Sequence, residues 1–222
     1  MPEVLETIEL ETGPAPRASV VLMHGLGADG NDFVPIVPEL GLEDRRPVRF
    51  VFPHAPMRPV SINRGYVMRA WYDIVVHGGG WREDAANVRE SRELIEALLE
   101  REKARGVPAG QIVLAGFSQG GAMALYAGLR HAERLAGILA LSSALPLADA
   151  LAAEASPVNR DVPLFMAHGT DDPTIPIARA IRSRDILTGL GYRVTWREYP
   201  MPHSVCPEEV NDISAWLADV LA

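Results

Sequence analysis

The chain has 222 residues, of which 48% are apolar and 23% are charged, and this ordinary globular composition excludes a disordered or fibrous protein. Its 21 Lys and Arg residues against 29 Asp and Glu residues give a formal net charge of −8. That charge argues against a protein that binds nucleic acid, or adsorbs to anionic membranes, through its overall charge.

Cysteine content and the start of the chain bear on where the protein works. Cys206 is the only cysteine, which excludes an intramolecular disulfide and a cysteine-cluster metal site and fits a reducing compartment. The first residues lack the basic segment and apolar run of a signal peptide. No stretch reaches the ~18 uninterrupted apolar residues of a spanning helix. We therefore expect a soluble, cytoplasmic protein without stable membrane insertion.

Short apolar runs rich in Val, Ile and Leu recur along the chain and predict strands. Near-continuous apolar runs are typical of strands that are buried on both faces of a parallel sheet. A later run alternates more and predicts a less buried strand. The predicted strands cover residues 19–23, 48–52, 111–115, 137–141, 162–166 and 192–199.

Helical patterns separate these strands, at residues 83–105, 120–131, 175–190 and 207–221. Alternation of strands and helices predicts an α/β fold with a mostly parallel, doubly wound sheet. No repeat or linker divides the chain, so residues 1–222 are expected to form one domain. Residues 53–81 fit no period and are expected to be a long functional loop.

A serine lies at the junction of a predicted strand and a predicted helix. Residues 116–120 read GFSQG and match the G-x-S-x-G pattern, with an apolar strand before them and a helix of small residues after them. A nucleophile elbow needs this context, because its serine occupies a strained turn that glycines relieve from crowding. The alternative is a glycine-rich turn with an incidental serine. The context favours Ser118 as a nucleophile.

A serine hydroxyl needs a histidine to take its proton. In the chain order of α/β-hydrolases, the acid and then the histidine follow the serine. The histidines are His24, His54, His77, His131, His168 and His203. Only His203 lies after both the serine and the candidate acids, in a turn between a strand and the last helix, and it is the predicted base.

The acid lies in residues 168–176, HGTDDPTIP, just after a predicted strand. Asp171 and Asp172 are neighbours there, and their spacing alone does not choose between them. One is expected to orient the imidazole while the other caps the following turn or helix.

Together these motifs resemble the carboxylesterase/acyl-protein thioesterase family, the small lidless α/β-hydrolases also described as phospholipase/carboxylesterase. Residues 24–27 (HGLG) look like the oxyanion loop of that family, and residues 116–121 (GFSQGG) look like its elbow. Residues 52–56, 58–60 and 70–74 are similar to its long loop, and residues 200–206 are similar to its histidine turn.

The resemblance implies an α/β-hydrolase fold without a cap domain, and it assigns several residues. It places the acid four residues after His168, which selects Asp172. An oxyanion needs two backbone donors, of which the residue after the nucleophile, Gln119, supplies one, and the resemblance implies Leu26 for the other. Trp71 and Trp81, in the long loop, are expected to wall an acyl pocket, with simple loop packing as the alternative.

We therefore expect a serine hydrolase that cleaves small-molecule carboxylic esters of short to medium acyl chains through a Ser118–His203–Asp172 triad. No cofactor and no metal are expected, and H-E-x-x-H is absent from the sequence. An acyl-protein thioesterase or lysophospholipase is the nearest alternative, because both use the same catalytic groups. A catalytically silent fold used as a binding module is the alternative from another class. Family members are often dimeric, so the resemblance also suggests that this protein can form a homodimer.

Overall fold

A seven-stranded sheet organises the computed structural model, which describes residues 5–42, 47–78 and 80–222. The strand order is β1-β3-β2-β8-β9-β10-β11, with β1 antiparallel to β3 and the other neighbours parallel. The strands are β1 (Thr7–Glu11), β2 (Ala18–Met23), β3 (Val48–Pro53), β8 (Ile112–Phe117), β9 (Gly137–Leu141), β10 (Leu164–Gly169) and β11 (Val194–Tyr199).

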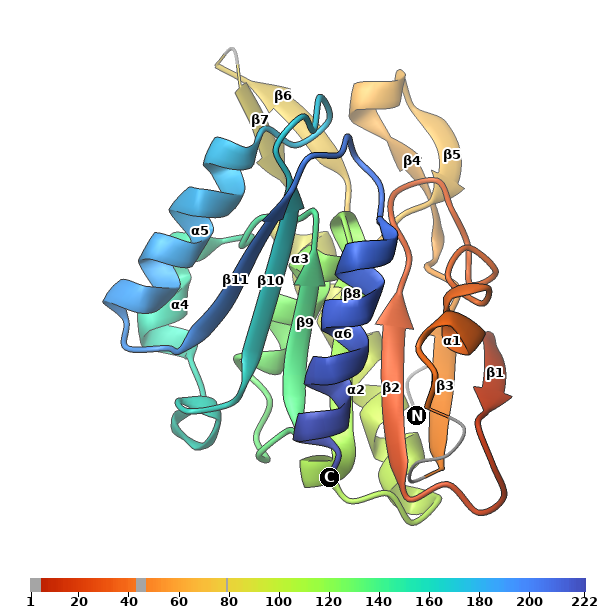
Figure 1. Ribbon diagram of the computed structural model, residues 1–222. Helices are drawn as coiled ribbons and strands as arrows, with labels where there is room; N and C mark the ends of the chain where they lie inside the picture. The colour runs from red at the N-terminus through yellow and green to blue at the C-terminus, as the bar shows by residue number, and fades with distance from the viewer. Residues whose placement is uncertain (1–4, 43–46, 79) are drawn as a thin grey trace.

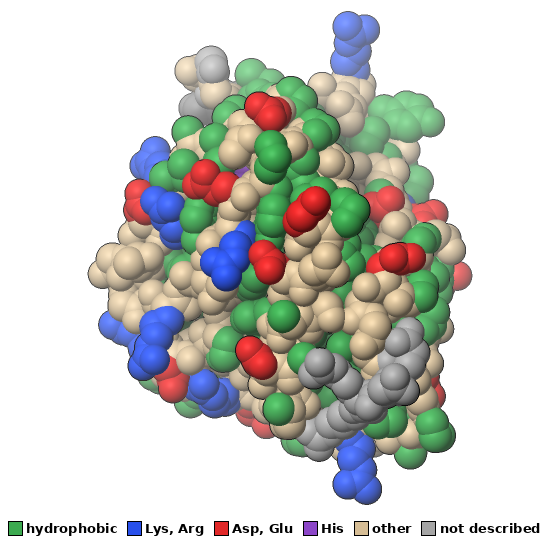
Figure 2. Space-filling model, viewed as in Figure 1, with side chains coloured by type: hydrophobic (Ala, Val, Ile, Leu, Met, Phe, Trp, Pro, Cys, Tyr) green, Lys and Arg blue, Asp and Glu red, His purple; other side chains and the backbone are tan. Residues whose placement is uncertain are grey.

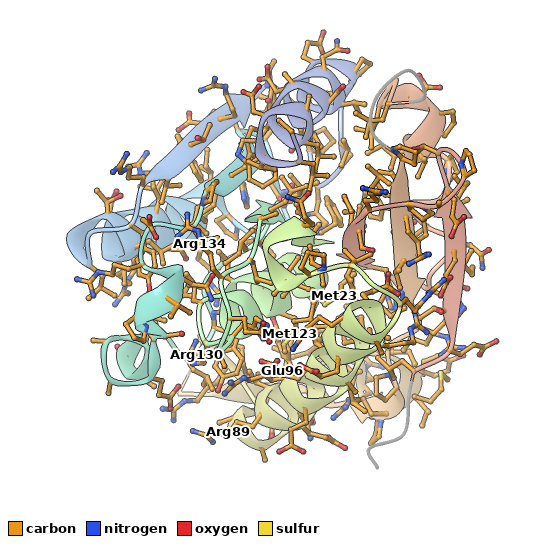
Figure 3. The ribbon with its side chains drawn as sticks, turned by 90° about the horizontal axis from the view of Figure 1, so that it is seen from below. Met23, Arg89, Glu96, Met123, Arg130 and Arg134 are labelled. Carbon is orange, nitrogen blue, oxygen red and sulfur yellow. The ribbon has the colours of Figure 1, made fainter. Side chains whose placement is uncertain are left out.

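Helices cover both faces of this sheet and bury one hydrophobic cluster on each side (Figure 1). One cluster contains side chains of α2, α3, α4 and α5, and the other contains side chains of α1 and α6. In the view from below, Met23 of β2 and Met123 of α3 lie in the first cluster (Figure 3). The helices are α1 (Ile36–Glu39), α2 (Ala85–Ala104), α3 (Gln119–Gly128), α4 (Ala148–Glu154), α5 (Ile177–Gly189) and α6 (Pro207–Val220).

The predicted α/β fold with a mostly parallel sheet is confirmed, and all six predicted strands and four predicted helices are present; the strand at 137–141 has the predicted bounds, and the others have shifted ends. The sequence patterns missed β1, α1 and α4, which are short or only partly buried. Among the described residues there are also three 3-10 turns, at Ser61–Asn63 (η1), Ala109–Gln111 (η2) and Pro157–Asn159 (η3). No helix in the described part of the chain is both long and apolar enough to span a bilayer.

The segment between β3 and α2, predicted as a loop, instead folds into two antiparallel hairpins. They are β4 (Met57–Val60) with β5 (Tyr66–Arg69), and β6 (Ile74–His77) with β7 (Gly80–Glu83). Their strands have four residues each and few buried side chains, so they are too short for a recognisable alternation of apolar and polar residues. Figure 1 shows both hairpins above the carboxyl ends of the parallel strands.

The strand order places a crevice at the carboxyl ends of β2 and β8. The chain runs from β2 to β3 on one side and later to β8 on the other side of β2, so these two neighbours mark a topological switch point. Ligands bind at such points in open α/β sheets. Residues 24–27 follow β2 and Ser118 follows β8, so the topology brings these two motifs together.

Acidic side chains are prominent on the face that α1 and α6 cover, and Lys and Arg gather mainly toward β11 and α5 (Figure 2). This distribution agrees with the formal net charge of −8.

Candidate active site

Ser118 occupies the turn between β8 and α3 in a conformation that side chains rarely adopt. Its backbone has φ 54° and ψ −119°, and its N–H donates to the Leu141 carbonyl at 2.8 Å. Two glycines make room for this turn. A Cβ at Gly116 would lie 2.2 Å from the Gly120 carbonyl carbon, and a Cβ at Gly120 would lie 2.1 Å from the Met23 oxygen. The geometry is therefore that of a nucleophile elbow.

A chain of hydrogen bonds runs from this serine through His203 to Asp172. The Ser118 Oγ lies 2.9 Å from Nε2 of His203, and Nδ1 of His203 lies 2.6 Å from Oδ2 of Asp172. The His203 ring also packs against Phe117, with ring centroids 4.7 Å apart. The three side chains predicted to form the triad thus lie in mutual hydrogen-bond reach, from the ends of β8, β10 and β11.

Asp172 both orients the imidazole and caps the following turn, two functions that the sequence analysis assigns to two neighbouring aspartates. Besides meeting His203, its Oδ1 accepts the N–H groups of Thr174 and Ile175, both at 2.8 Å. The expectation that the other aspartate caps this turn is wrong, because Asp171 is exposed and its side chain meets only the Thr170 hydroxyl, at 3.4 Å. One carboxylate therefore both orients the imidazole and fixes its own loop.

His168 supports Asp172 from below, a role that the sequence reasoning missed. Its Nε2 donates to the Ile175 carbonyl at 2.8 Å and lies 3.3 Å from Oδ2 of Asp172, and its side chain is fully buried. Burial lowers the pKa of His168 below its ordinary value, so this ring stays neutral beside the carboxylate. Its position four residues before Asp172 was the signal available in the sequence.

The loop after β2 lies against the elbow. A Cβ built on Gly25 would come within 3.3 Å of the Ser118 Cβ, and Leu26 lines the same cavity as Ser118 and Gln119. His24 anchors this loop: its Nδ1 meets the Gly25 carbonyl at 2.7 Å, and its Nε2 accepts the Ala55 N–H at 3.1 Å. That pattern requires the neutral ring, and burial lowers the pKa of His24 accordingly.

The Gln119 side chain ties the elbow to the segment that precedes the second hairpin. Its Oε1 accepts the Trp71 N–H and its Nε2 donates to the Tyr72 carbonyl, both at 2.7 Å. The backbone N–H of Gln119 starts α3, where helix N–H groups have no intrahelical partner. This amide is therefore free to face developing negative charge near Ser118, as is expected of an oxyanion donor.

The two tryptophans have different positions. Trp71, expected in the pocket wall, is fully buried, and its indole N–H donates to the His24 carbonyl at 3.0 Å. It lies behind the cavity and supports the loop after β2, so we correct its assignment as a substrate contact. Trp81, 52% exposed, does line the cavity. The two tryptophans differ in burial, and sequence spacing does not reveal which of two loop tryptophans turns inward.

Beside Ser118 lies a cavity of about 260 Å³. Its mostly apolar lining includes residues from the elbow, the loop after β2, both hairpin segments and the start of α5. They are Leu26, Ile62, Asn63, Tyr72, Ile74, Trp81, Glu83, Ser118, Gln119, Ala122, Ala144, Thr174, Ile175 and Arg179.

The sheet carries a serine in a strained strand-to-helix turn, and the Oγ of this serine lies 2.9 Å from a histidine nitrogen. A buried carboxylate contacts the other nitrogen of that histidine. This arrangement defines a serine hydrolase of the α/β-hydrolase fold. The model of the Phospholipase/Carboxylesterase family matches residues 6–221. The chain therefore belongs to that family, as its motifs predicted.

Relatives with assigned names agree with this placement. Over 209 residues, the chain is 40% identical to acyl-protein thioesterase 1 of Gibberella zeae, covering 90% of this chain and 89% of the relative. Acyl-protein thioesterase 1 of Cryptococcus neoformans is 34% identical over 239 residues and covers all of both chains. Among solved structures, acyl-protein thioesterase 2 of Zea mays has a TM-score of 0.83 at 27% identity, covering 98% of this chain and 99% of that chain.

Proposed function

We propose that this protein hydrolyses carboxylic acyl thioesters and oxygen esters through an acyl-enzyme formed on Ser118. The observation that carries the proposal is the hydrogen-bond chain from Ser118 through His203 to Asp172, which opens into an apolar cavity. A binding module without activity has no use for a buried carboxylate that orients an imidazole toward a strained serine. That arrangement favours an enzyme.

In this mechanism the Ser118 hydroxyl attacks the acyl carbonyl and passes its proton to Nε2 of His203. Asp172 holds the Nδ1–H and stabilises the imidazolium. The Leu26 and Gln119 amides stabilise the oxyanion of the tetrahedral intermediate. His203 then protonates the departing thiolate or alkoxide, and the acyl group stays on Ser118. Water, deprotonated by His203, releases the acid in the second half-reaction, so no cofactor is needed.

The triad does not distinguish between a thiolate leaving group and an alkoxide leaving group. Thioesters and oxygen esters form the same acyl-enzyme, and the relatives named acyl-protein thioesterase 1 support the thioester. The cavity of about 260 Å³ is slightly smaller than the roughly 300 Å³ at which ligand pockets typically begin. This size supports acyl groups of short to medium length, in agreement with the sequence-based expectation.

A side-by-side turnover assay tests the proposal. Purified protein is given an octanoyl-thioester peptide, a palmitoyl-thioester peptide, p-nitrophenyl octanoate and a lysophospholipid, with the Ser118→Ala variant as control. We expect turnover of the octanoyl thioester and the octanoate ester, both lost in the variant. A lysophospholipid rate above both would assign the protein as a lysophospholipase. Absence of all turnover from the parent protein would overturn the hydrolase proposal.

A further inference from the structure

The acyl cavity has one charged part in an otherwise mostly apolar lining. Glu83, the last residue of β7, and Arg179, in the first turn of α5, both line the cavity. Nη2 of Arg179 lies 3.3 Å from Oε1 of Glu83. Their side chains are 21% exposed for Glu83 and 41% exposed for Arg179, so water still reaches the pair. We call these two residues the charged wall.

Both residues of the charged wall are fixed by backbone hydrogen bonds. Glu83 pairs with Ile74 across the second hairpin, and the next residue, Asp84, donates its N–H to the Asp73 carbonyl at 2.9 Å. Asp84 also caps α2, because its side chain accepts the Asn87 N–H at 2.8 Å. The N–H of Arg179 donates to the Pro176 carbonyl at 2.8 Å. The backbone at both residues is therefore fixed, and the ion pair joins their side chains in the wall.

Tyr72 connects the charged wall to the elbow. Its backbone carbonyl accepts a hydrogen bond from the Gln119 side chain, and its ring lines the cavity. Burial raises the pKa of Tyr72, with Glu83 acting in the same direction and Arg179 against it, so the phenol is neutral and feels both charges. A neutral hydroxyl thus lies in the field of an ion pair on one side of the acyl cavity.

An acyl chain interacts differently with the two kinds of wall. Each methylene that enters an apolar site gains about 0.8 kcal/mol, which is roughly fourfold in an equilibrium constant. A methylene that covers a hydrated ion pair displaces water from charged groups that it cannot hydrogen-bond, which opposes this gain. The benefit of a longer chain should therefore stop where the chain meets the charged wall.

We infer that Glu83 and Arg179 set the upper limit of acyl-chain length, so that the enzyme selects short to medium acyl groups over long ones. This inference rests on the proposed function, since it concerns the acyl group that Ser118 accepts. Both residues lie outside the hydrogen-bonded triad and do not touch the reacting carbonyl. They are specificity determinants and not catalytic residues.

The test is an acyl-chain series with variants that keep the size of the wall and remove its charge. kcat/KM is measured for p-nitrophenyl acetate, butyrate, hexanoate, octanoate, decanoate and laurate, using the parent protein and the double variant Glu83→Gln/Arg179→Met. We expect kcat/KM of the parent to rise by roughly fourfold per methylene and then to level off or fall. In the double variant the rise should continue for at least two further carbons, so that the ratio of kcat/KM for laurate to kcat/KM for acetate increases.

Two control variants separate polarity from mere tethering of the hairpin to α5. The variant Glu83→Arg keeps the wall charged but replaces the attraction between the two side chains with repulsion, and it should retain the parental chain-length limit. Asp161→Asn/Arg134→Met removes an exposed ion pair near the amino ends of β9 and β10, far from the cavity, and should change nothing (Figure 3 labels Arg134). If Glu83→Arg behaves like the neutral double variant, the pair acts as a tether and the inference is wrong.

The inference and the proposed function fail in different ways. An unchanged chain-length profile in the neutral double variant, with normal acetate turnover, overturns the charged wall as the limit and leaves the hydrolase intact. Absence of turnover of every ester by the parent protein, even when a fluorophosphonate still labels Ser118, overturns the proposed function itself. Melting temperatures of all variants are measured alongside, so that loss of fold is recognised.

Discussion

The segments that follow β8 and β10 and the hairpin segment between β3 and α2 border the same cavity but are built differently. Ser118 and Asp172 are only 8% and 7% exposed, and hydrogen bonds fix each of them. The hairpin segment carries large apolar side chains that are more than half exposed: Met57, Tyr66, Val67, Val76 and Trp81. We expect the buried region to determine which reaction occurs, and the part of the exposed region that lines the cavity to determine which acyl group is accepted.

This contrast also has a physical reason. A triad needs atoms within hydrogen-bond distance, so its supports must be buried and rigid. A cavity wall contributes through size and polarity, which side-chain changes on short exposed hairpins alter without disturbing the core. Changes in the first region should therefore reduce rates for every ester alike. Changes in the second should redistribute rates among esters.

The largest expected effect belongs to the buried region. Ser118→Ala should reduce kcat by at least about three orders of magnitude for every acyl length, because only binding and the oxyanion donors remain. Turnover and fluorophosphonate labelling, followed by mass spectrometry, measure this. Persistent labelling of the variant at another residue would show that Ser118 is not the nucleophile.

The adjacent aspartates sharpen the comparison within the buried region. Asp172→Asn should reduce kcat by several orders of magnitude, because an amide at this position favours the wrong imidazole tautomer. It should also lower the melting temperature, since the new amide weakens the hydrogen-bond network that holds the loop. Asp171→Asn, at an exposed side chain, should retain most activity and stability. The reverse pattern of activities would transfer the acid assignment to Asp171.

Gln119 connects the two regions, and its substitution should affect both. Gln119→Ala leaves the Trp71 N–H and the Tyr72 carbonyl without their 2.7 Å partners, at a cost of about 1–3 kcal/mol for each buried group. The backbone amide near Ser118 stays, so the rate should fall far less than in Ser118→Ala. Thermal unfolding and kcat on one ester measure the two effects. An unchanged melting temperature would show that this side chain does not join the regions.

The smallest expected effect on activity concerns a carboxyl group in α6, the helix that follows the histidine turn. Glu209 is fully buried, and burial raises its pKa to about 8 although the backbone N–H of Cys206 acts in the opposite direction. Its protonated form is thus favoured in the folded state, so its contribution to stability is complete below the unfolded value of 4.5 and is lost as pH rises toward about 8.

The Glu209→Gln variant stays neutral at every pH, so it avoids this loss. The stability difference between the variant and the parent should grow in favour of the variant by up to about 1.4 kcal/mol per pH unit across that interval. Urea unfolding at several pH values measures how this stability difference changes with pH. A packing defect caused by the amide would be the same at every pH, so it would not alter that change. A pH-independent difference would show that Glu209 is not buried in its protonated form. Ester turnover at one pH should be nearly unchanged.

The buried region was readable from the sequence because its chemistry demands particular residue types in a particular order. Ser118 and His203 followed from the elbow pattern and from chain order, and the family resemblance then selected Asp172. The double role of Asp172 could not be predicted from the sequence, because the direction of a side chain in a turn depends on backbone angles that the neighbouring residue types do not specify. The paired expectation for Asp171 failed for that reason.

The structure of the hairpin segment could not be predicted from the sequence for a different reason. Strands such as Tyr66–Arg69 and Gly80–Glu83 have four residues with mixed polarity, so neither a period of two nor a buried run can be recognised. Trp71 and Trp81 could not be told apart, since burial of one depends on its hydrogen bond to His24, a residue far away in the sequence. The opposite charges of Glu83 and Arg179 meet across 96 positions of the chain.

The backbone of Ser118 has a consequence for folding as well as for chemistry. A non-glycine residue held at φ 54° and ψ −119° costs about 1–3 kcal/mol, so the elbow opposes folding and the rest of the core must hold it in place. Glycine adopts positive φ without this strain, at a cost of roughly 0.5–1 kcal/mol from its greater freedom when unfolded. Ser118→Gly should therefore melt higher than Ser118→Ala, although both are inactive. Selection for thermal stability alone would remove the nucleophile, and only selection for turnover keeps a side chain at this position.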